Sequence, residues 1–188
     1  MKNTVIILGG PGGTGRTTLI DQLAKSLNLR PIHGGIIMRQ IATELGYGPD
    51  EAKIVQFHQQ YLPNHPEVDL EVDAKLFEEA LKGSVVMESM TFAPITHRLQ
   101  LDYLRIWVTA TENERARRIC KREAERGNIY TVDEMMEITR HRLRANQERY
   151  LALYGFDFLD VDKYYTLSFD TTDIPVNEMA GKLLEKIQ

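Results

Sequence analysis

The sequence predicts an α/β fold in which helices flank a mostly parallel β-sheet. Short runs of β-branched residues alternate along the chain with segments of helical periodicity, and this alternation is typical of parallel sheets. The first run, residues 4–8, is continuous and β-branched, as expected of a strand that is buried on both faces. The 188 residues, 43% of them hydrophobic and 27% charged, suit one globular domain with a substantial core.

Five strands are predicted from short apolar runs that lie between turn signals. In folds of this kind, ligands bind beyond the carboxyl ends of the strands. Gly9, Gly10, Glu88 and Asp170 all lie at predicted strand ends, so we expect these segments to line one site. The predicted strands are residues 4–8, 29–33, 84–88, 103–109 and 165–169.

The helices are predicted from apolar periodicity and from residues that begin or end a helix. Leu19, Leu23 and Leu27 fall on one face of the segment after the first glycine-rich turn. Thr131 and Glu134 have the spacing of a capping box at the start of a long helix. The predicted helices are residues 17–27, 36–45, 49–61, 69–81, a helix that begins near 111, 131–153 and 175–187.

Charge and cysteine content narrow the classes of function. The net charge is −4, so a nucleic-acid partner would require a local basic patch, and acidic residues interrupt every basic stretch. The single cysteine, Cys120, cannot form an intrachain disulfide, which fits a reducing compartment. No apolar run has the length of a signal peptide core or a membrane span. We expect a cytoplasmic monomer or homodimer that binds neither nucleic acid nor membrane.

A glycine-rich motif follows the first predicted strand. Residues 10–17 fit the pattern G-x-x-x-x-G-K-[ST] of a phosphate-binding loop, except that Arg16 replaces the usual lysine. Glycines let backbone amides approach phosphates closely, and the helix start adds unpaired amides and a partial positive charge. The hydroxyl of Thr17 is the expected Mg²⁺ ligand. The residues predicted to hold the phosphates of a nucleoside triphosphate are Gly10, Gly12, Gly13, Thr14, Gly15, Arg16, Thr17 and Thr18.

Arg16 leaves two interpretations of this loop open. Arginine keeps the positive charge of lysine but replaces a compact ammonium with a broad planar fork. The loop either supports catalysis or binds a nucleoside triphosphate without turnover. A glycine-rich turn without any ligand is disfavoured, because strand, loop and helix appear in the required order.

Further arginines suggest a lid that closes over phosphates. Phosphoryl transfer depends mostly on positioning and charge neutralisation, and bidentate guanidinium groups suit phosphate oxygens. Arg115, Arg118 and Arg122 fall on one helical face, and Arg142 and Arg149 are two turns apart. A solvated helix face, paired with nearby glutamates, is the alternative for any single arginine. The cluster as a whole favours phosphate binding.

Acidic residues are candidate ligands for a second substrate. Asp69 and Asp73 can contact a base or sugar, or they can be acids that the dipole favours near a helix N-terminus. Glu88 can orient an acceptor or hold Mg²⁺ through water. The five histidines show no paired metal-ligand spacing, so no metal site made by protein side chains alone is expected.

Nine short segments of the chain, taken together, resemble the cytidylate kinase-like P-loop kinases, particularly the short archaeal-type cytidylate kinases, and the resemblance extends over nearly the full chain. Only the first segment is specific by itself, but the order and spacing of the set are specific. The segments are residues 10–18, 35–42, 66–73, 85–88, 106–110, 139–142, 148–150, 154–157 and 169–172.

The resemblance implies a P-loop kinase domain that spans residues 1–188. Its fold would be a three-layer sandwich around a five-stranded parallel sheet, with an acceptor-binding insertion at about 34–82 and a helical lid at about 120–148. Its reaction would be transfer of the γ-phosphoryl group of ATP, with Mg²⁺, to a nucleoside monophosphate.

The resemblance also implies roles for individual residues. Arg39 would contact the acceptor phosphate, and Arg142 and Arg149 would close over the transferring phosphoryl group. Asp170 and Thr172 would lie near the adenine.

Two departures from the family pattern bear on the acceptor. Met90 stands where an arginine usually follows the third strand, and Gln147 stands where a lid arginine is often found. The expected acceptor is a pyrimidine monophosphate, CMP or dCMP. A kinase of a non-nucleotide metabolite and a regulatory module that binds a nucleoside triphosphate without transfer are the alternatives.

Overall fold

A computed structural model describes residues 4–187, and its centre is a single five-stranded sheet. All the strand pairs are parallel and the strand order is β2–β3–β1–β4–β5, which confirms the predicted sheet. Leu8 pairs with Glu88 on one side and with Ile106 on the other, so the carboxyl ends of the central strands lie close together. The strands are β1 (Val5–Gly9), β2 (Arg30–His33), β3 (Val85–Glu88), β4 (Leu104–Thr109) and β5 (Leu167–Asp170).

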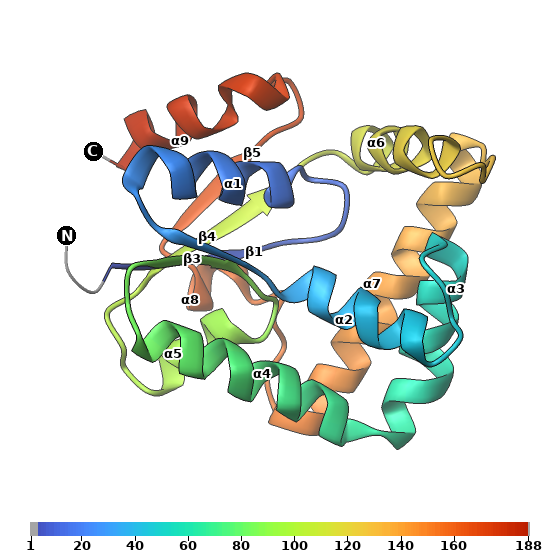
Figure 1. The fold of residues 1–188 in the computed structure, drawn as a ribbon, viewed down its shortest axis with the longest axis horizontal. Helices are drawn as coiled ribbons and strands as arrows, with labels where there is room; N and C mark the ends of the chain where they lie inside the picture. The colour runs from blue at the N-terminus through green and yellow to red at the C-terminus, as the bar shows by residue number, and fades with distance from the viewer. Residues whose placement is uncertain (1–3, 188) are drawn as a thin grey trace.

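Helices cover both faces of the sheet (Figure 1). The helices α1 (Arg16–Leu27) and α9 (Met179–Ile187) lie on one face, and α4 (Pro66–Leu81) and α5 (Phe92–Arg98) lie on the other. Alternate residues of β1 point to opposite faces of the sheet. Val5 and Ile7 pack in the core under α4 and α5, whereas Ile6 and Leu8 pack in the core under α1 and α9. This two-sided burial explains the uninterrupted apolar run in the sequence.

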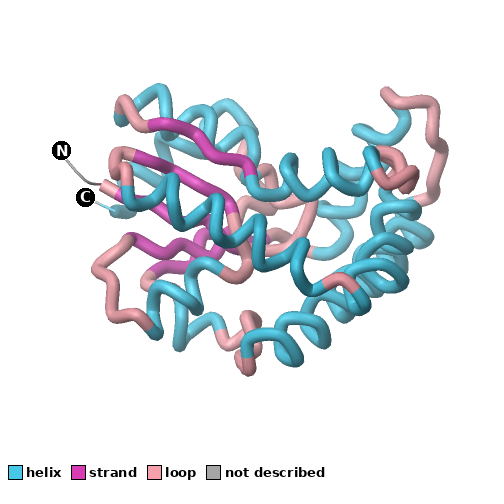
Figure 2. The backbone as a smooth tube through the Cα atoms, turned by 60° about the horizontal axis from the view of Figure 1, so that its bottom comes forward, coloured by secondary structure: helices cyan, strands magenta, loops and turns pink. Residues whose placement is uncertain are grey.

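A helical arm extends beyond the carboxyl ends of the strands (Figures 1 and 2). Within it, α6 (Glu112–Ala124) and α7 (Val132–Tyr154) enclose a small core of Ala116, Ile119 and Met135. The arm contains α2 (Gly34–Glu44), α3 (Glu51–Gln56), a π-helical turn (Phe57–Tyr61), a 3-10 turn (Leu62–Asn64), α6 (Glu112–Ala124) and α7 (Val132–Tyr154).

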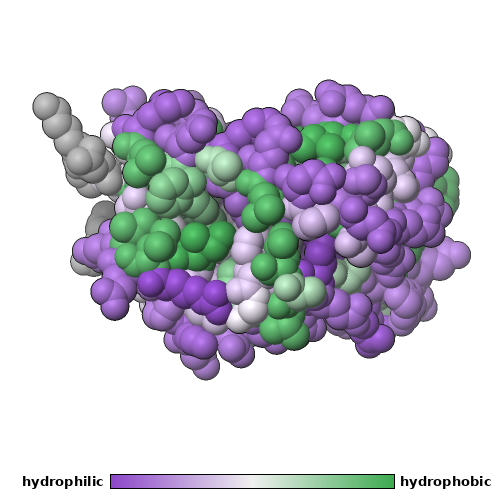
Figure 3. All heavy atoms as spheres, turned by 90° about the horizontal axis from the view of Figure 1, so that it is seen from below, coloured by the Kyte–Doolittle hydropathy of each residue, from purple (hydrophilic) through white to green (hydrophobic). Residues whose placement is uncertain are grey.

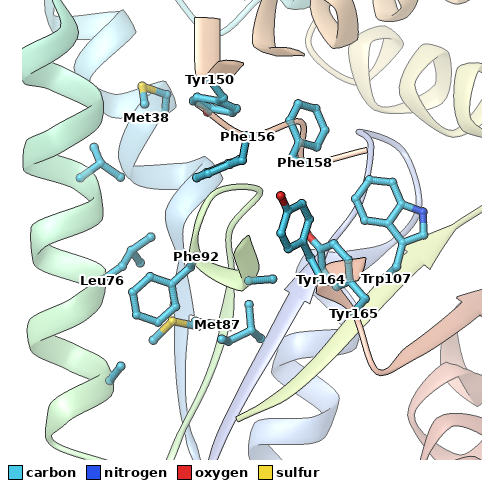
Figure 4. Close-up of a cluster of buried hydrophobic side chains, with 14 of the residues drawn as sticks. Met38, Leu76, Met87, Phe92, Trp107, Tyr150, Phe156, Phe158, Tyr164 and Tyr165 are labelled. Carbon is cyan, nitrogen blue, oxygen red and sulfur yellow. The ribbon is translucent and has the colours of Figure 1, made fainter. Parts of the chain in front are cut away.

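Aromatic side chains join the end of the arm to the sheet (Figure 4). Tyr150 of α7 meets Phe158 edge-on with ring centroids 5.8 Å apart, and Trp107 of β4 meets Tyr165 at 5.1 Å. Arg98 of α5 donates hydrogen bonds of 2.7 Å to the carbonyls of Tyr154 and Gly155 at the end of α7. These contacts fix the base of α7, so the side chains along this helix are held at set positions beyond the sheet.

Most predicted elements agree with the structure to within three residues, and the capping box of Thr131 and Glu134 is confirmed. The single helix predicted over 49–61 is instead α3 followed by the π-helical turn. The closing helix is preceded by a separate 3-10 turn (Val176–Glu178). Two short helices, α5 and α8 (Val161–Tyr164), were not predicted.

The surface is polar for the most part. Seen from below in Figure 3, its hydrophobic residues form several separate groups within a largely hydrophilic face. Across residues 4–187, no helix combines the length and the apolar character that crossing a membrane requires.

Candidate active site

The loop between β1 and α1 depends on glycine at two close approaches. Gly10 has a φ of 137°, and a Cβ atom there would collide with the carbonyl oxygen of Val108 in β4. Gly13 has a φ of 85°, and a Cβ atom there would lie 2.6 Å from the carbonyl oxygen of Arg115. Both positions therefore require glycine for conformational and for steric reasons.

The start of α1 is free to bind an anion. Gly15 is the N-cap, and within the described chain neither a side-chain cap nor an acidic residue in the first turn occupies the amides of this helix. Unpaired amides and the positive end of the helix dipole then face the loop. Thr17 and Thr18 are exposed in the same turn.

The loop is held from behind by α6 and by the segment after β5. The hydroxyl of Thr171 lies 2.9 Å from the carbonyl oxygen of Thr14, and Arg118 donates a 2.7 Å hydrogen bond to the carbonyl of Thr171. Arg115 donates a 3.2 Å hydrogen bond to the carbonyl of Ala110. This scaffold presets the loop before any ligand binds.

Asp170 and Thr172 mainly organise the turn after β5. Asp170 accepts hydrogen bonds from the amide (2.8 Å) and the hydroxyl (2.6 Å) of Thr172, and these bonds lower the pKa of the Asp170 carboxyl. The amide of Thr111 donates to the same hydroxyl at 2.9 Å. Neither residue lines the pocket beside the loop, so their predicted place near the adenine stays a prediction.

A pocket of about 490 Å³, here called the loop pocket, lies against the glycine-rich loop. Its floor is residues 12–18, and its walls come from α2, β3, α6 and α7. Six arginines line it, which gives the pocket the charge that a polyphosphate requires. They are Arg16, Arg39, Arg118, Arg122, Arg126 and Arg142.

A smaller pocket of about 80 Å³, here called the inner pocket, adjoins the loop pocket. Arg16, Gly35, Glu88 and Arg142 line both pockets. The inner pocket is further lined by Gly34, Met38, His58, Asp69, Val72, Asp73, Leu76, Ser89, Met90, Thr91, Asn146 and Tyr150.

Arg16 and Glu88 form the boundary between the two pockets. Burial lowers the pKa of the Arg16 guanidinium, and the negative charge of Glu88 opposes that effect. Glu88 accepts a 3.1 Å hydrogen bond from the amide of Gly35, which fixes the start of α2 against the end of β3. The sequence placed both residues correctly at strand and helix ends, and the fold brings them together.

Arg149 and Asp69, which were predicted as separate ligands, form an ion pair with each other. Arg149 donates hydrogen bonds of 2.8 and 3.3 Å to the Asp69 carboxylate, and both side chains are buried. The same guanidinium contacts Asn146 Oδ1 and His58 Nδ1, each at 3.1 Å. Arg149 does not line the loop pocket, so its role over the phosphoryl group stays a prediction.

Asp73 and His58 give the inner pocket two polar groups of unusual protonation. Burial raises the pKa of Asp73 to about 6, although hydrogen bonds from Thr91 Oγ1 (2.6 Å) and the Tyr154 hydroxyl oppose the rise. Burial, together with Arg142 and Arg149, holds the pKa of His58 well below its usual value.

The tautomer of His58 follows from its partner. A guanidinium can only donate, so His58 Nδ1 accepts from Arg149 and the neutral ring carries its proton on Nε2. This buried Nε2 has no hydrogen-bond partner within residues 4–187. Sequence reasoning missed His58, because a lone histidine without ligand spacing gives no local signal.

Glu51 accepts hydrogen bonds from three of the arginines that line the loop pocket. Arg39 and Arg142 each donate a 2.6 Å hydrogen bond to its carboxylate, and Arg122 donates one of 3.0 Å. The Glu51 side chain is fully buried. Opposite charges hold its pKa far below the ordinary value, despite the opposing effect of burial. Glu51 was not among the predicted site residues.

The two departures from the family pattern lie in different places. Met90 lines the inner pocket, and its sulfur lies 3.7 Å from Asn146 Nδ2. Gln147 donates a 2.7 Å hydrogen bond to Asp157 and lines neither pocket.

Known proteins resemble this chain in sequence. A family model described as "AAA domain" matches residues 6–144. A curated cytidylate kinase of Thermococcus kodakarensis is 36% identical over 160 residues, which cover 85% of this chain and 76% of the relative. A cytidylate kinase of Staphylothermus marinus is 32% identical over 184 residues, which cover 98% of this chain and 96% of the relative.

Solved structures resemble the fold. A shikimate kinase from Acinetobacter baumannii, in complex with shikimate, has a TM-score of 0.60 and is 16% identical in sequence. The match covers 98% of this chain and 93% of that kinase's chain. A shikimate kinase from Bacteroides thetaiotaomicron has a TM-score of 0.58 at 15% identity, with 98% of each chain covered. The likeness confirms the predicted fold class.

Proposed function

This chain belongs to the AAA domain family and to the cytidylate kinase family, and from that premise we propose that it transfers the γ-phosphoryl group of ATP to the phosphate of CMP or dCMP. One observation carries the proposal. Arg16 and Arg142 line both the loop pocket and the inner pocket, so one phosphoryl group at the boundary can face cations from two sides.

The loop pocket is proposed to take the triphosphate of ATP. The uncapped start of α1 and the glycine cradle fit phosphate oxygens, and the six arginines supply the opposing charge. Residues 4–187 contain no group of three or more His, Cys, Asp or Glu side chains that could hold a metal ion. Thr17 is the proposed protein ligand for Mg²⁺, because this hydroxyl-bearing residue is exposed at the start of α1, directly after the glycine-rich loop. When bound, the ion would neutralise charge on the phosphates.

The inner pocket is proposed to take the acceptor. His58 lines this pocket, and its buried Nε2 has no hydrogen-bond partner within residues 4–187. An unpaired buried N–H donor costs about 1–3 kcal/mol, so a ligand whose acceptor atom reached it would be stabilised. Asp69 and Asp73 from α4 face the same pocket and can contact the base or sugar. Arg39, at the rim of the loop pocket, is proposed to hold the acceptor phosphate.

The proposed reaction is a direct displacement at the γ-phosphorus. An oxygen of the acceptor phosphate forms the new bond, the bond to the β–γ bridging oxygen breaks, and ADP leaves with that oxygen. No general base is needed, because the acceptor phosphate is already anionic. Arg16 and Arg142 stabilise the charge that is shared by the entering, transferring and leaving groups.

A coupled assay of ADP formation tests the proposal. We expect ATP-dependent turnover with CMP and dCMP. With AMP, GMP and UMP, kcat/KM should be lower than with CMP by about tenfold or more, since their bases present other hydrogen-bonding edges. Arg142→Ala should lower kcat by about 100- to 1,000-fold, as expected for loss of one preorganised donor.

Arg144→Ala is the matched control, because Arg144 lies two residues further along α7, is exposed and lines neither pocket. It should keep nearly full activity. Absence of turnover with every nucleoside monophosphate would refute the proposal, and turnover with a non-nucleotide metabolite alone would identify a different acceptor class.

A further inference from the structure

Glu51 is a fully buried carboxylate that touches three arginines from three separate helices. Its Oε2 atom accepts from Arg39 of α2 at 2.6 Å and from Arg122 of α6 at 3.0 Å. Its Oε1 atom accepts from Arg142 of α7 at 2.6 Å. A buried charge is tolerated only when it is paired and hydrogen-bonded, and here both carboxylate oxygens are engaged.

The position of Glu51 is itself fixed by its neighbours. Asp50, the N-cap of α3, accepts from the amide of Lys53 at 3.1 Å and from the hydroxyl of Tyr130 at 2.7 Å. Arg126, in the segment between α6 and α7, donates to the carbonyl of Pro49 at 3.3 Å. The start of α3 is thereby tied to the segment between α6 and α7.

The three arginines line the loop pocket, whereas Glu51 does not. Glu51 lines a separate cavity of about 30 Å³, together with Arg142 and with Gly12 and Arg16 of the phosphate loop. The carboxylate therefore contacts the guanidinium groups from outside the loop pocket. Each arginine contacts Glu51 through one terminal nitrogen, and a guanidinium has five N–H donors, so donors remain for phosphate oxygens.

The charges explain why a carboxylate is useful there. Three guanidinium groups that converge on one place repel one another, and the repulsion is stronger where water is excluded. One carboxylate offsets part of that repulsion, so Glu51 and its three arginines together carry a net charge of +2, from three positive charges and one negative charge. The buried Glu123 carboxylate, 3.4 Å from Arg122, further offsets the charge of that arginine. The arginines can then be in place before the phosphates arrive.

We propose that Glu51 is a positioning residue, which holds Arg39, Arg122 and Arg142 over the phosphate loop and acts on phosphoryl transfer only through them. The inference rests on the proposed kinase function for its kinetic consequence. Its structural consequence, the order of the three guanidinium groups, can be measured without turnover.

The kinetic test compares Glu51→Gln with Glu51→Asp. Glu51→Gln removes the charge at nearly constant size, and misplaced catalytic groups should lower kcat by about 100-fold while KM for ATP changes much less. Glu51→Asp keeps the charge needed for folding but withdraws it by one methylene, so it should fold normally and lose about tenfold in kcat.

A double-mutant cycle separates positioning from a general structural role. If Glu51 acts through Arg142, the loss in kcat for the variant with both Glu51→Gln and Arg142→Ala should be far smaller than the product of the two single losses. Glu112→Gln is the matched control: it removes another carboxylate that links α6 to α7, through Arg140, but that pair is half-exposed and lies outside both pockets. It should leave kcat unchanged.

A second readout does not depend on activity. Nitrogen-15 spectra of arginine Nε–H groups, assigned with the arginine variants, should show ordered signals for Arg39, Arg122 and Arg142 in the unmodified protein. These signals should broaden in Glu51→Gln and persist in Glu112→Gln. If the unmodified enzyme turns over but both Glu51 variants keep kcat within about threefold, or if the signals are unchanged, the inference is wrong while the kinase proposal stands. If no nucleotide is turned over but the signals respond as expected, the proposed function fails and the positioning of the arginines by Glu51 stands.

Discussion

At the residue scale, Asp73 shows how the inner pocket controls charge. It lies part-way along α4, where burial raises its pKa to about 6 and the nearby Asp69 carboxylate adds to the rise. Hydrogen bonds from Thr91 and Tyr154 favour the ionised form but do not compensate for burial. Near neutral pH the folded protein therefore carries a carboxylate in a place that favours the neutral acid.

This environment predicts a pH-dependent cost to stability. The folded pKa of about 6 exceeds the usual value of 3.8, so between these values the folded protein holds a proton that the unfolded chain has released. The free energy of unfolding should therefore fall as the pH rises through this window, and the full loss is reached above the folded pKa. Asp73→Asn, which cannot ionise, should gain about 1 kcal/mol relative to the unmodified protein between about pH 5 and pH 8.

Urea unfolding at several pH values measures that difference. Asp162→Asn, at the exposed first turn of α8, is the control for removal of a carboxylate at the surface. A stability difference between Asp73→Asn and the unmodified protein that stays constant with pH would contradict the raised pKa.

The sequence predicted the individual residues of the site unevenly. The glycines, Arg16 and Thr17 follow from a local motif whose spacing and place between strand and helix are sufficient to identify it. Glu51 could not be found in this way, because its three arginines are 12, 71 and 91 residues away along the chain. In its local sequence, Glu51 is an acidic residue in the first turn of a helix. The helix dipole alone favours an acidic residue there, so the position gives no sign of a functional role.

At the element scale, α7 is the element on which most of the site depends. It is 23 residues long and carries Arg142, Asn146, Arg149 and Tyr150 toward the inner pocket or its supporting contacts. Its start is a full capping box: Glu134 N donates to Thr131 Oγ1 at 3.2 Å, and Thr131 N donates to Glu134 Oε2 at 2.8 Å. This cap satisfies amides that would otherwise be unpaired.

Removal of the cap should destabilise the protein without changing its site. Thr131→Ala should lower the free energy of unfolding by about 1 kcal/mol, which corresponds to a fall in Tm of about 2–4 °C for a chain of this size. Thr131→Ser keeps the hydroxyl and should stay close to the unmodified protein. Equal Tm values for the alanine and serine variants in a thermal melt would show that the capping hydroxyl contributes little.

Elements with strong local signals were predicted, and those that depend on tertiary contacts were not. α5 has only seven residues and includes Pro94 and Thr96, so no clear periodicity marks it. The π-helical turn within residues 57–61 lies in a run that reads as a continuation of α3. The wider turn buries both Phe57 and His58, although adjacent residues of a regular helix usually point in different directions.

At the scale of the whole molecule, the alternation of strands and helices was enough to predict the sheet and its layers. The alternation did not reveal that the arm brings α2, α6 and α7 to one place beyond the strand ends. That convergence depends on contacts such as those of Glu51 and of the aromatic residues at the base of α7. Its consequence is that two pockets of different character meet at Arg16, Gly35, Glu88 and Arg142.

Adjacent pockets with a shared wall predict that one molecule can occupy both. Adenosine and cytidine joined at their 5′ oxygens by five phosphates would place the polyphosphate along the loop and one base in each region. Binding of the second half is then intramolecular, so affinity should exceed that of either nucleotide alone by about 100-fold or more. A ligand that binds only the folded state, and is present at a concentration of 100 times its Kd, stabilises that state by about 2.7 kcal/mol, so the thermal midpoint reports this affinity.

Adenosine 5′-pentaphosphate is the matched ligand control, because it carries the same phosphates without cytidine. The joined compound should raise the midpoint further than this control, and Arg142→Ala should reduce the shift, since Arg142 faces both pockets. Equal shifts from the two compounds would mean that only the loop pocket is engaged, and the inner pocket would then lose its assignment as the acceptor site.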